Sequence, residues 1–313
     1  MKKFLFTILI FTLVFLVIIA ASLLFIPNKK ITDNSLYSNI DKHRRLDSLP
    51  SPKIIFVGGS NLAFGLDSKS IEEKTGLPVV NMGLHAGFGL RFTINEVKHA
   101  IKQGDIVIFS PVYQYFTSSD ISYGEKVLVA LCFDVDKQNL KYIDFGQAIH
   151  LISNTISYGI SKLFPKNLDV MQGNGIGYEK VYKRNSFNEF GDENMHWDWQ
   201  NMPIDTPKDT NQVNAEIYKR AIDFVVDFKN FVEKRGATFY IIPPPFRYSN
   251  SLINRNLISN LKTQFLQKNI YFTIPPQECN MADSLFFNTP YHLNKQGVDI
   301  YTEMIIQKIF NRQ

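Results

Sequence analysis

The chain has 313 residues, of which 45% are hydrophobic and 20% are charged, and its formal net charge is +5. This composition is that of an ordinary folded chain and excludes a disordered or collagen-like one. The charge is mild and the Lys and Arg residues are scattered, so we expect no nucleic-acid partner. The tight basic cluster Lys42-His43-Arg44-Arg45 is better explained as a solvated segment near lipid headgroups.

The first predicted element is a membrane-spanning helix. An unbroken apolar run from Phe4 to Ile26 exceeds the ~30 Å hydrocarbon core at 1.5 Å per residue. We interpret residues 1–28 as an uncleaved signal anchor that binds the membrane through residues 4–26. The alternative is a signal peptide cleaved near Ala20-Ala21-Ser22, although the apolar run continues past that site. Lysines flank both ends, and because amino-terminal anchors usually keep their short end inside, we expect a single-pass protein with an extracytoplasmic body.

The remaining chain predicts one α/β domain. Residues 29–50 are polar and irregular, so we interpret them as a linker, and 51–313 as the domain. Short apolar runs alternate there with amphipathic stretches, which predicts a parallel sheet flanked by helices. The expected strands are Ile54–Val57, Val79–Met82, Ile106–Phe109, Thr238–Ile242 and Tyr271–Ile274. Helical spacing of apolar residues predicts helices at about 90–101, 217–232, 257–265 and 298–309.

The alternation of short apolar runs with amphipathic stretches is absent at about 117–210. This stretch is rich in Asn, Gly, Tyr and Phe, and we predict a partly helical insertion over the C-terminal edge of the sheet, where substrate contacts belong. Its glycine run at 172–177 is not a phosphate loop, because no strand leads into it and no Gly-Lys-Ser/Thr ends it. Cys132 and Cys279 form a disulfide or stay as buried thiols, which the sequence leaves open. No Cys/His spacing predicts a metal site.

Ser60 carries the strongest chemical signal. It follows Gly58-Gly59 at the end of the first expected strand, where open α/β sheets place their chemistry. The glycines admit unusual backbone angles and let a substrate approach closely. His292, before the last expected helix, offers a base for a serine nucleophile. A turn serine or a lone histidine has an ordinary structural explanation, so only their pairing suggests a site.

Four segments, in order, resemble the SGNH/GDSL hydrolase superfamily, and more narrowly its membrane-anchored bacterial branch, whose members take part in modifying cell-envelope polysaccharides. The segments are Gly58-Gly59-Ser60-Asn61, Asn81-Met82-Gly83-Leu84, Gly104-Asp105 with Ser110-Pro111, and His292. The resemblance covers roughly residues 53–116 and 236–310. It implies a flavodoxin-like three-layer α/β/α sandwich with a mostly parallel five-stranded sheet, a serine nucleophile and no cofactor.

The resemblance also implies residue roles. Ser60 takes the nucleophile position and His292 the base position, and the backbone N–H groups of Ser60 and Gly83 would form an oxyanion hole. The chain departs from the superfamily after the third strand, where an Asn side chain usually completes that hole. The residues here read Ser110-Pro111-Val112-Tyr113-Gln114, so Gln114 or Tyr113 would have to donate instead.

A second departure concerns the partner of the histidine. Asn288, four residues before His292, stands where the superfamily has an aspartate, and Thr289 stands three before. A neutral amide orients an imidazole but stabilises the imidazolium less than a carboxylate does. Asp283 and Asp192 are the alternative partners, although both have an ordinary explanation as surface carboxylates.

Three further residues are candidates for substrate binding at the edge of the sheet where the strands end and Ser60 is expected. Asn61 adjoins the nucleophile, although it is also a plausible helix cap. His85 follows Gly83 closely and is also explained as an ordinary loop histidine. Arg247 follows the prolines that end the fourth strand, and its guanidinium suits an anionic glycan or phosphate group, unless it is simply solvent-exposed.

These observations predict a serine-dependent acyl-ester hydrolase or O-acyltransferase for cell-envelope glycans or their acyl esters. The sequence does not separate water from a sugar hydroxyl as acceptor, and a membrane-bound acyltransferase is an expected partner. The alternative is a catalytically weakened SGNH-fold protein that binds glycan or supports an envelope assembly complex. A third interpretation, a structural membrane protein without chemistry, requires the order of motifs to be coincidence.

Overall fold

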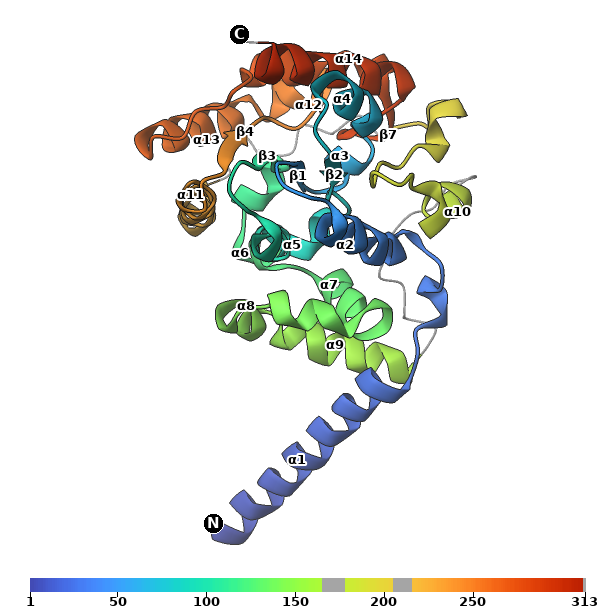
Figure 1. Ribbon diagram of the computed structural model, residues 1–313. Helices are drawn as coiled ribbons and strands as arrows, with labels where there is room; N and C mark the ends of the chain where they lie inside the picture. The colour runs from blue at the N-terminus through green and yellow to red at the C-terminus, as the bar shows by residue number, and fades with distance from the viewer. Residues whose placement is uncertain (165–177, 205–215, 312–313) are drawn as a thin grey trace.

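The computed structural model describes residues 1–164, 178–204 and 216–311, so the glycine run at 172–177 lies outside the described residues. Its centre is a four-stranded parallel sheet with the strand order β2-β1-β3-β4 (Figure 1). The strands of this sheet are β1 (Ile54–Gly58), β2 (Val79–Asn81), β3 (Ile106–Ser110) and β4 (Thr238–Ile241). Two small pairs accompany it: β5 (Phe246–Arg247) with β6 (Asn280–Met281), and β7 (Phe286–Thr289) with β8 (His292–Leu293).

Helices surround the sheet and extend the molecule on one side (Figure 1). The α-helices of the described ranges are α1 (Lys2–Phe25), α2 (Ser38–Ser48), α3 (Ser60–Ala63), α4 (Ser68–Thr75), α5 (Gly89–Asn95), α6 (Ser119–Tyr123), α7 (Lys126–Ala130), α8 (Phe145–His150), α9 (Ile152–Leu163), α10 (Tyr178–Val181), α11 (Lys219–Lys234), α12 (Tyr248–Ile253), α13 (Arg255–Gln267) and α14 (Lys295–Ile305).

The sheet is central because its strands are apolar on both faces. All five residues of β1 are buried, and Ile54 pairs in register with Val79 on one side and Ile106 on the other. Alternate residues point to opposite faces of a strand. One face packs with α5, α11 and α13, and the other packs with α4 and α14. The protein is therefore a mixed α/β structure with helices on both faces of a parallel sheet.

The expected fifth strand does not form as a strand. Residues 271–274 make only one parallel bridge, Phe272 with Ile241, and the Thr273 N–H donates to the Ile241 carbonyl at 2.8 Å. Prolines at 243–245 end β4 and two more follow Ile274. Because proline has no N–H to donate, the ladder cannot extend beyond the C-terminal ends of these two segments.

Residues 29–50 differ from the linker that we expected. They form short 3-10 turns and α2, and both Leu36 and Leu46 are completely buried. Lys42 on α2 is buried as well, with its ammonium bonded to backbone carbonyls of the domain. The polar composition misled the sequence prediction because long side chains such as lysine can place their stems in the core.

The first half of the insertion lies elsewhere than predicted. Instead of covering the C-terminal edge of the sheet, α7, α8 and α9 lie between the sheet and α1 (Figure 1). Apolar residues of α7 and α9 form a separate cluster with Ile19 and Leu23 of α1. Cys132 belongs to this cluster, Cys279 belongs to the core around α14, and both are buried free thiols.

The N-terminal helix α1 projects from the body of the protein (Figure 1). It is long and apolar enough to cross a membrane, judged by length and composition. Most of its apolar side chains are exposed, but its last turns contact α9. There the Ser22 hydroxyl donates to the Gly159 carbonyl at 2.9 Å, and the Lys162 ammonium donates to the Leu23 carbonyl at 3.1 Å.

Candidate active site

Ser60 is the first residue of α3, directly after β1, and it is half-buried. The neighbouring glycines serve close packing rather than unusual backbone angles, since neither Gly58 nor Gly59 has a positive φ. A Cβ on Gly58 would lie 2.5 Å from the Ser110 carbonyl oxygen. The turn that presents Ser60 is therefore held tightly against the end of β3.

Asn61 connects the ends of β1 and β3. Its side-chain amide donates to both the carbonyl and the hydroxyl of Ser110 at 3.1 Å, and its Oδ1 accepts from the Gly59 N–H at 3.1 Å. The residue is completely buried. Asn61 thus fixes the Ser60 turn, whereas we expected a substrate contact or a cap of the following helix.

The Gly83 loop lies against the same turn. A Cβ on Gly83 would be 2.6 Å from the Gly59 carbonyl oxygen, so only glycine allows this approach. The Gly83 N–H donates to Asn81 Oδ1 at 3.0 Å. The Asn81 amide donates in turn to the Leu62 carbonyl and to Asp192. The expected oxyanion donor therefore lies beside Ser60, and in this conformation it is hydrogen-bonded within the protein.

His292 is held in place by the ring of Phe64 and by the side-chain amide of Asn288. Its imidazole stacks on Phe64, with centroids 4.1 Å apart and an interplanar angle of 5°. Its Nδ1 is 2.9 Å from Asn288 Oδ1 and 3.3 Å from the Tyr182 hydroxyl, to which the Asn288 amide also donates at 3.0 Å. Because the amide oxygen only accepts, Nδ1 carries the hydrogen, which leaves the Nε2 lone pair available as a base.

Ser60 and His292 are brought near each other through Phe64. This residue follows α3 four positions after Ser60, and its ring covers the imidazole of His292. No hydrogen bond joins the Ser60 hydroxyl to His292 within the described residues. Such contacts often tighten only when substrate is bound. The structure thus brings the two residues to one end of the sheet without forming the bond itself.

Burial controls the charge of His292. Loss of hydration lowers its pKa to about 3, with smaller contributions from His196 and His85. The imidazole is therefore neutral at physiological pH and able to accept a proton. The partner of the His292 Nδ1 is the neutral amide of Asn288 and not a carboxylate.

The lowered pKa predicts an acid-sensitive fold. His292 has a pKa near 6.5 when unfolded and about 3 when folded, so between these values the unfolded chain binds the extra proton. The contribution of His292 to the free energy of unfolding is fully present above about pH 6.5. Below that pH this contribution falls by about 1.4 kcal/mol per pH unit. Denaturant unfolding of the detergent-solubilised chain between about pH 6.5 and 5 measures this slope, above the range of most carboxylates. The His292→Gln variant should show a shallower slope, and equal slopes would contradict the assignment.

A buried pair that the sequence prediction missed holds the strand of His292. The His196 Nδ1 contacts the Glu193 carboxylate, and its Nε2 donates to the Leu293 carbonyl at 2.8 Å. Both residues are completely buried, and burial raises the pKa of Glu193. Through these contacts the pair ties residues 193–196 of the insertion to β8. Only the spacing of three residues between Glu and His could have pointed to the contact.

The two alternative aspartates do not contact His292. Asp192 is completely buried and accepts from the backbone and the hydroxyl of Ser68 at 2.8 and 2.6 Å. Asp283 pairs with Arg247 at 3.2 Å and accepts from the Ser249 N–H. Asp192 is therefore not a surface carboxylate, whereas the Asp283 side chain stays partly exposed beside Arg247. The side chain that lies against His292 is Asn288, whose Oδ1 is 2.9 Å from the imidazole Nδ1.

The other residues predicted to bind substrate or the oxyanion are His85, Gln114 and Arg247. The His85 Nδ1 accepts from the Gly87 N–H at 2.9 Å, and burial lowers the pKa of His85 to about 4. The adjoining Ala86 packs near Gly59. Gln114 is exposed, whereas Tyr113 beside it is buried. Arg247 has its side chain 13% exposed, and its backbone N–H donates to the Pro290 carbonyl, two residues before His292.

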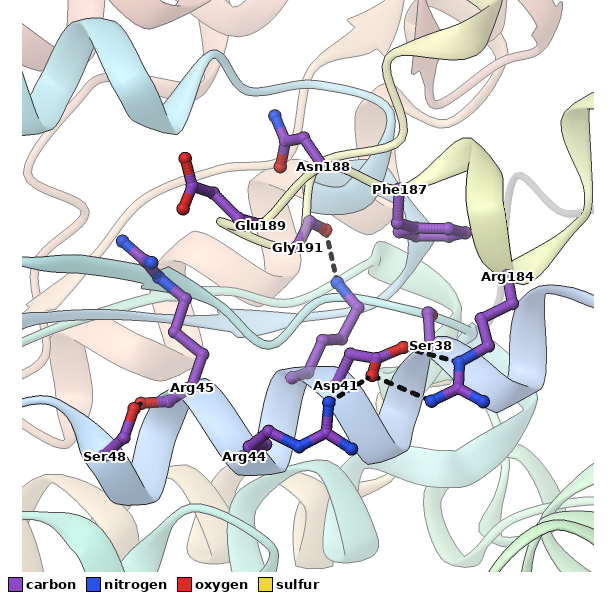
Figure 2. A pocket seen from close by; sticks show the side chains of 11 residues that line it. Ser38, Asp41, Arg44, Arg45, Ser48, Arg184, Phe187, Asn188, Glu189 and Gly191 are labelled. Atoms are coloured by element: carbon purple, nitrogen blue, oxygen red, sulfur yellow. Dashed lines mark hydrogen bonds and ion pairs between the residues drawn. The ribbon is translucent and has the colours of Figure 1, made fainter.

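A second feature is a basic pocket of about 400 Å³ between α2 and residues 184–191 (Figure 2). Arg44 and Arg184 both contact the Asp41 carboxylate, as the dashed lines show. Lys42 donates to the carbonyls of Asn81, at 2.9 Å, and Gly191, and burial lowers the pKa of Lys42 to about 7. Because these cations are bonded within the protein, we interpret the pocket as a junction that ties α2 to the Asn81 loop.

Comparison with known protein families and with curated proteins returns no match to this chain. Across the described ranges, no group of three or more His, Cys, Asp or Glu side chains is arranged to hold a metal ion. The chemistry of the site therefore has to be argued from its own residues.

Proposed function

We propose that the protein is a membrane-anchored member of the SGNH/GDSL hydrolase superfamily that transfers acyl groups on cell-envelope glycans through an acyl-serine intermediate. The observation that carries the proposal is the His292 arrangement. The ring stacks on Phe64, the residue that follows the short helix beginning at Ser60, and the bond from Nδ1 to Asn288 leaves Nε2 free to accept a proton. A serine hydroxyl needs such a neighbouring base to become a nucleophile.

The reaction follows from these roles. The Ser60 Oγ attacks the acyl carbonyl carbon while the Nε2 of His292 takes the hydroxyl proton. The alcohol of the ester leaves with that proton, and the acyl group stays on Ser60. Water or a sugar hydroxyl then attacks the acyl-serine and loses its proton to His292. The bond from the acyl carbon to Ser60 Oγ breaks, His292 returns the proton to Oγ, and the acceptor carries the acyl group away. The oxyanion forms at the N-terminus of α3, where the Ser60 N–H is the nearest donor and the Gly83 N–H must exchange its bond to Asn81 to help.

The membrane placement is part of the same proposal. We infer that α1 is retained as a single span and that the body lies outside the cytoplasm. The packing of Ile19 against Gly159 of α9 supports retention, because cleavage near Ala20-Ala21-Ser22 would remove Ile19 from this interface. An anchored site close to the lipid surface suits an acyl donor delivered by a membrane-bound acyltransferase.

One pair of observations favours the alternative, a weakened SGNH-fold protein that binds glycan or supports an assembly complex. The Gly83 N–H is bonded to Asn81, and Asn288 gives the imidazolium no countercharge. Both features lower the expected rate. Neither prevents binding of a glycan at the same rim, where Arg247 retains guanidinium nitrogens without a hydrogen-bond partner.

The test is an acyl-transfer assay with the full chain in detergent. We expect the protein to release acetate from an acetylated envelope oligosaccharide or an activated acetyl ester, or to move the acetyl group onto an oligosaccharide acceptor. Mass spectrometry distinguishes the two products. Retention of every acyl group, together with measurable binding of the same oligosaccharide, would favour the alternative function over the enzyme.

A further inference from the structure

An exposed apolar surface lies on α8 and α9, outside the candidate site. We call it the α8–α9 face, and its residues, with their exposed fractions, are Phe145 (83%), Ile149 (51%), Ile152 (54%), Ile160 (39%), Leu163 (38%) and Phe164 (62%). On α9 these residues recur at helical spacing, so they form one stripe along the helix. A contiguous exposed apolar surface usually marks an interaction site.

The α8–α9 face is continuous with the N-terminal helix. Next to this stripe, α9 packs on α1 so closely that a Cβ on Gly159, seven residues after Ile152, would lie 2.7 Å from Ile19. At this junction Lys162 is buried and bonds both the Leu23 carbonyl and the Asp134 carboxylate, the latter at 2.8 Å. A cation at the end of α1 also suits the negative end of the helix dipole. The two helices are therefore rigidly connected.

The depth of this contact places α9 at the edge of a bilayer. The contact begins at Ile19, which precedes the end of the apolar run at Ile26 by seven residues, or about 10 Å of helix. Helices that lie in a membrane interface bury their apolar face by about 5–10 Å. Lys29 and Lys30 follow α1 and are exposed, as expected for residues at the level of lipid headgroups.

We propose that the α8–α9 face docks on the lipid bilayer beside α1, so that the body is held in one orientation above the membrane. The proposal rests on insertion of α1, which belongs to the proposed function, but it does not depend on the acyl-transfer chemistry. Figure 1 shows α8 and α9 at the end of the body from which α1 projects. Together, the span and the face would fix the distance of Ser60 from the lipid surface.

The experiment measures lipid contact at single positions of the full chain. Ile152→Cys and Ile160→Cys variants carry an environment-sensitive fluorophore and are reconstituted, one copy per nanodisc, with lipids that bear a nitroxide quencher near the headgroup. Leu9→Cys in α1 reports insertion of the span. Leu266→Cys on α13 is the matched control, because Leu266 is apolar and 41% exposed and its helix α13 lies far from α1 (Figure 1). The parent chain, with both cysteines buried, corrects for background labelling.

We expect blue-shifted and quenched emission at 152 and 160, and no quenching at 266. Quenching at position 9 without quenching at 152 and 160 would overturn the docking of the face while leaving the anchor intact. Absence of quenching at position 9 would overturn both the anchor and the docking. Protection of 152 and 160 only in discs that hold two copies would assign the face to a second chain instead of lipid.

Discussion

Replacing Ser60 with alanine should abolish turnover of an acyl ester, with a loss on the order of 10⁶-fold if Ser60 acts as serine nucleophiles do in triad proteases. The hydroxyl forms the acyl intermediate, and alanine offers no atom to replace it. The fold should be unaffected, since Ser60 is only half-buried and Asn61, not Ser60, holds the turn against Ser110. Steady-state kinetics and circular dichroism of the full chain measure both expectations.

Ser259→Ala is a suitable control for this substitution. Ser259 is an exposed serine on α13, away from the site, so its replacement should change neither turnover nor folding. If a well-folded Ser60→Ala variant kept its turnover, the serine mechanism would be wrong. Loss of folding in Ser60→Ala would show instead that the hydroxyl has a structural role that its surroundings do not suggest.

Replacing Asn288 with aspartate should increase the rate. The change puts a carboxylate 2.9 Å from the Nδ1 of His292, where it stabilises the imidazolium that forms during attack. The same charge raises the pKa of His292 from its lowered value of about 3. We expect kcat to rise by about tenfold or more, and the acid limb of the pH profile to move to higher pH by about one unit or more. The Tyr182 hydroxyl can rotate to donate to the new carboxylate, so the geometry should survive.

The pH profile of kcat/KM separates this expectation from its alternatives. Asn288→Ala is the matched variant, since it removes the oxygen that orients the imidazole without adding charge, and it should be slower than the parent. A decrease in rate for Asn288→Asp, with Ser60 still essential, would show that Asn288 does not occupy the aspartate position. An unchanged acid limb would show that His292 is not the titrating base.

The sequence predicted the centre of the fold and failed at its periphery. Residues 54–57 and 106–109 are short runs of β-branched and aromatic residues, a pattern that indicates buried strands. Helices α11, α13 and α14 were also confirmed, because their apolar residues repeat at helical spacing. The prediction of a fifth strand was wrong because prolines follow both β4 and residues 271–274 and stop the pairing there. The prediction of a linker was wrong because Leu46 and Lys42 of α2 are buried in the domain.

The candidate site divides in the same way. Ser60, His292 and Asn288 could be named from the sequence because short motifs bring them to the ends of strands. Tyr182, His196 and Glu193 could not, since their positions depend on how the insertion folds back onto β8. Tertiary contacts of this kind leave no periodicity to detect. Phe64 is an intermediate case, because its spacing of four residues from Ser60 predicts a shared helix face but not the ring that it covers.

The most direct test of the central claim is labelling of the full chain, in detergent, with a fluorophosphonate probe that reacts with activated serines. We predict labelling of the parent protein, and none of the Ser60→Ala or His292→Ala variants. That result would establish a serine nucleophile activated by a histidine base. An unlabelled parent that is well folded, or labelling that persists in Ser60→Ala, would contradict the proposed mechanism and favour a glycan-binding role.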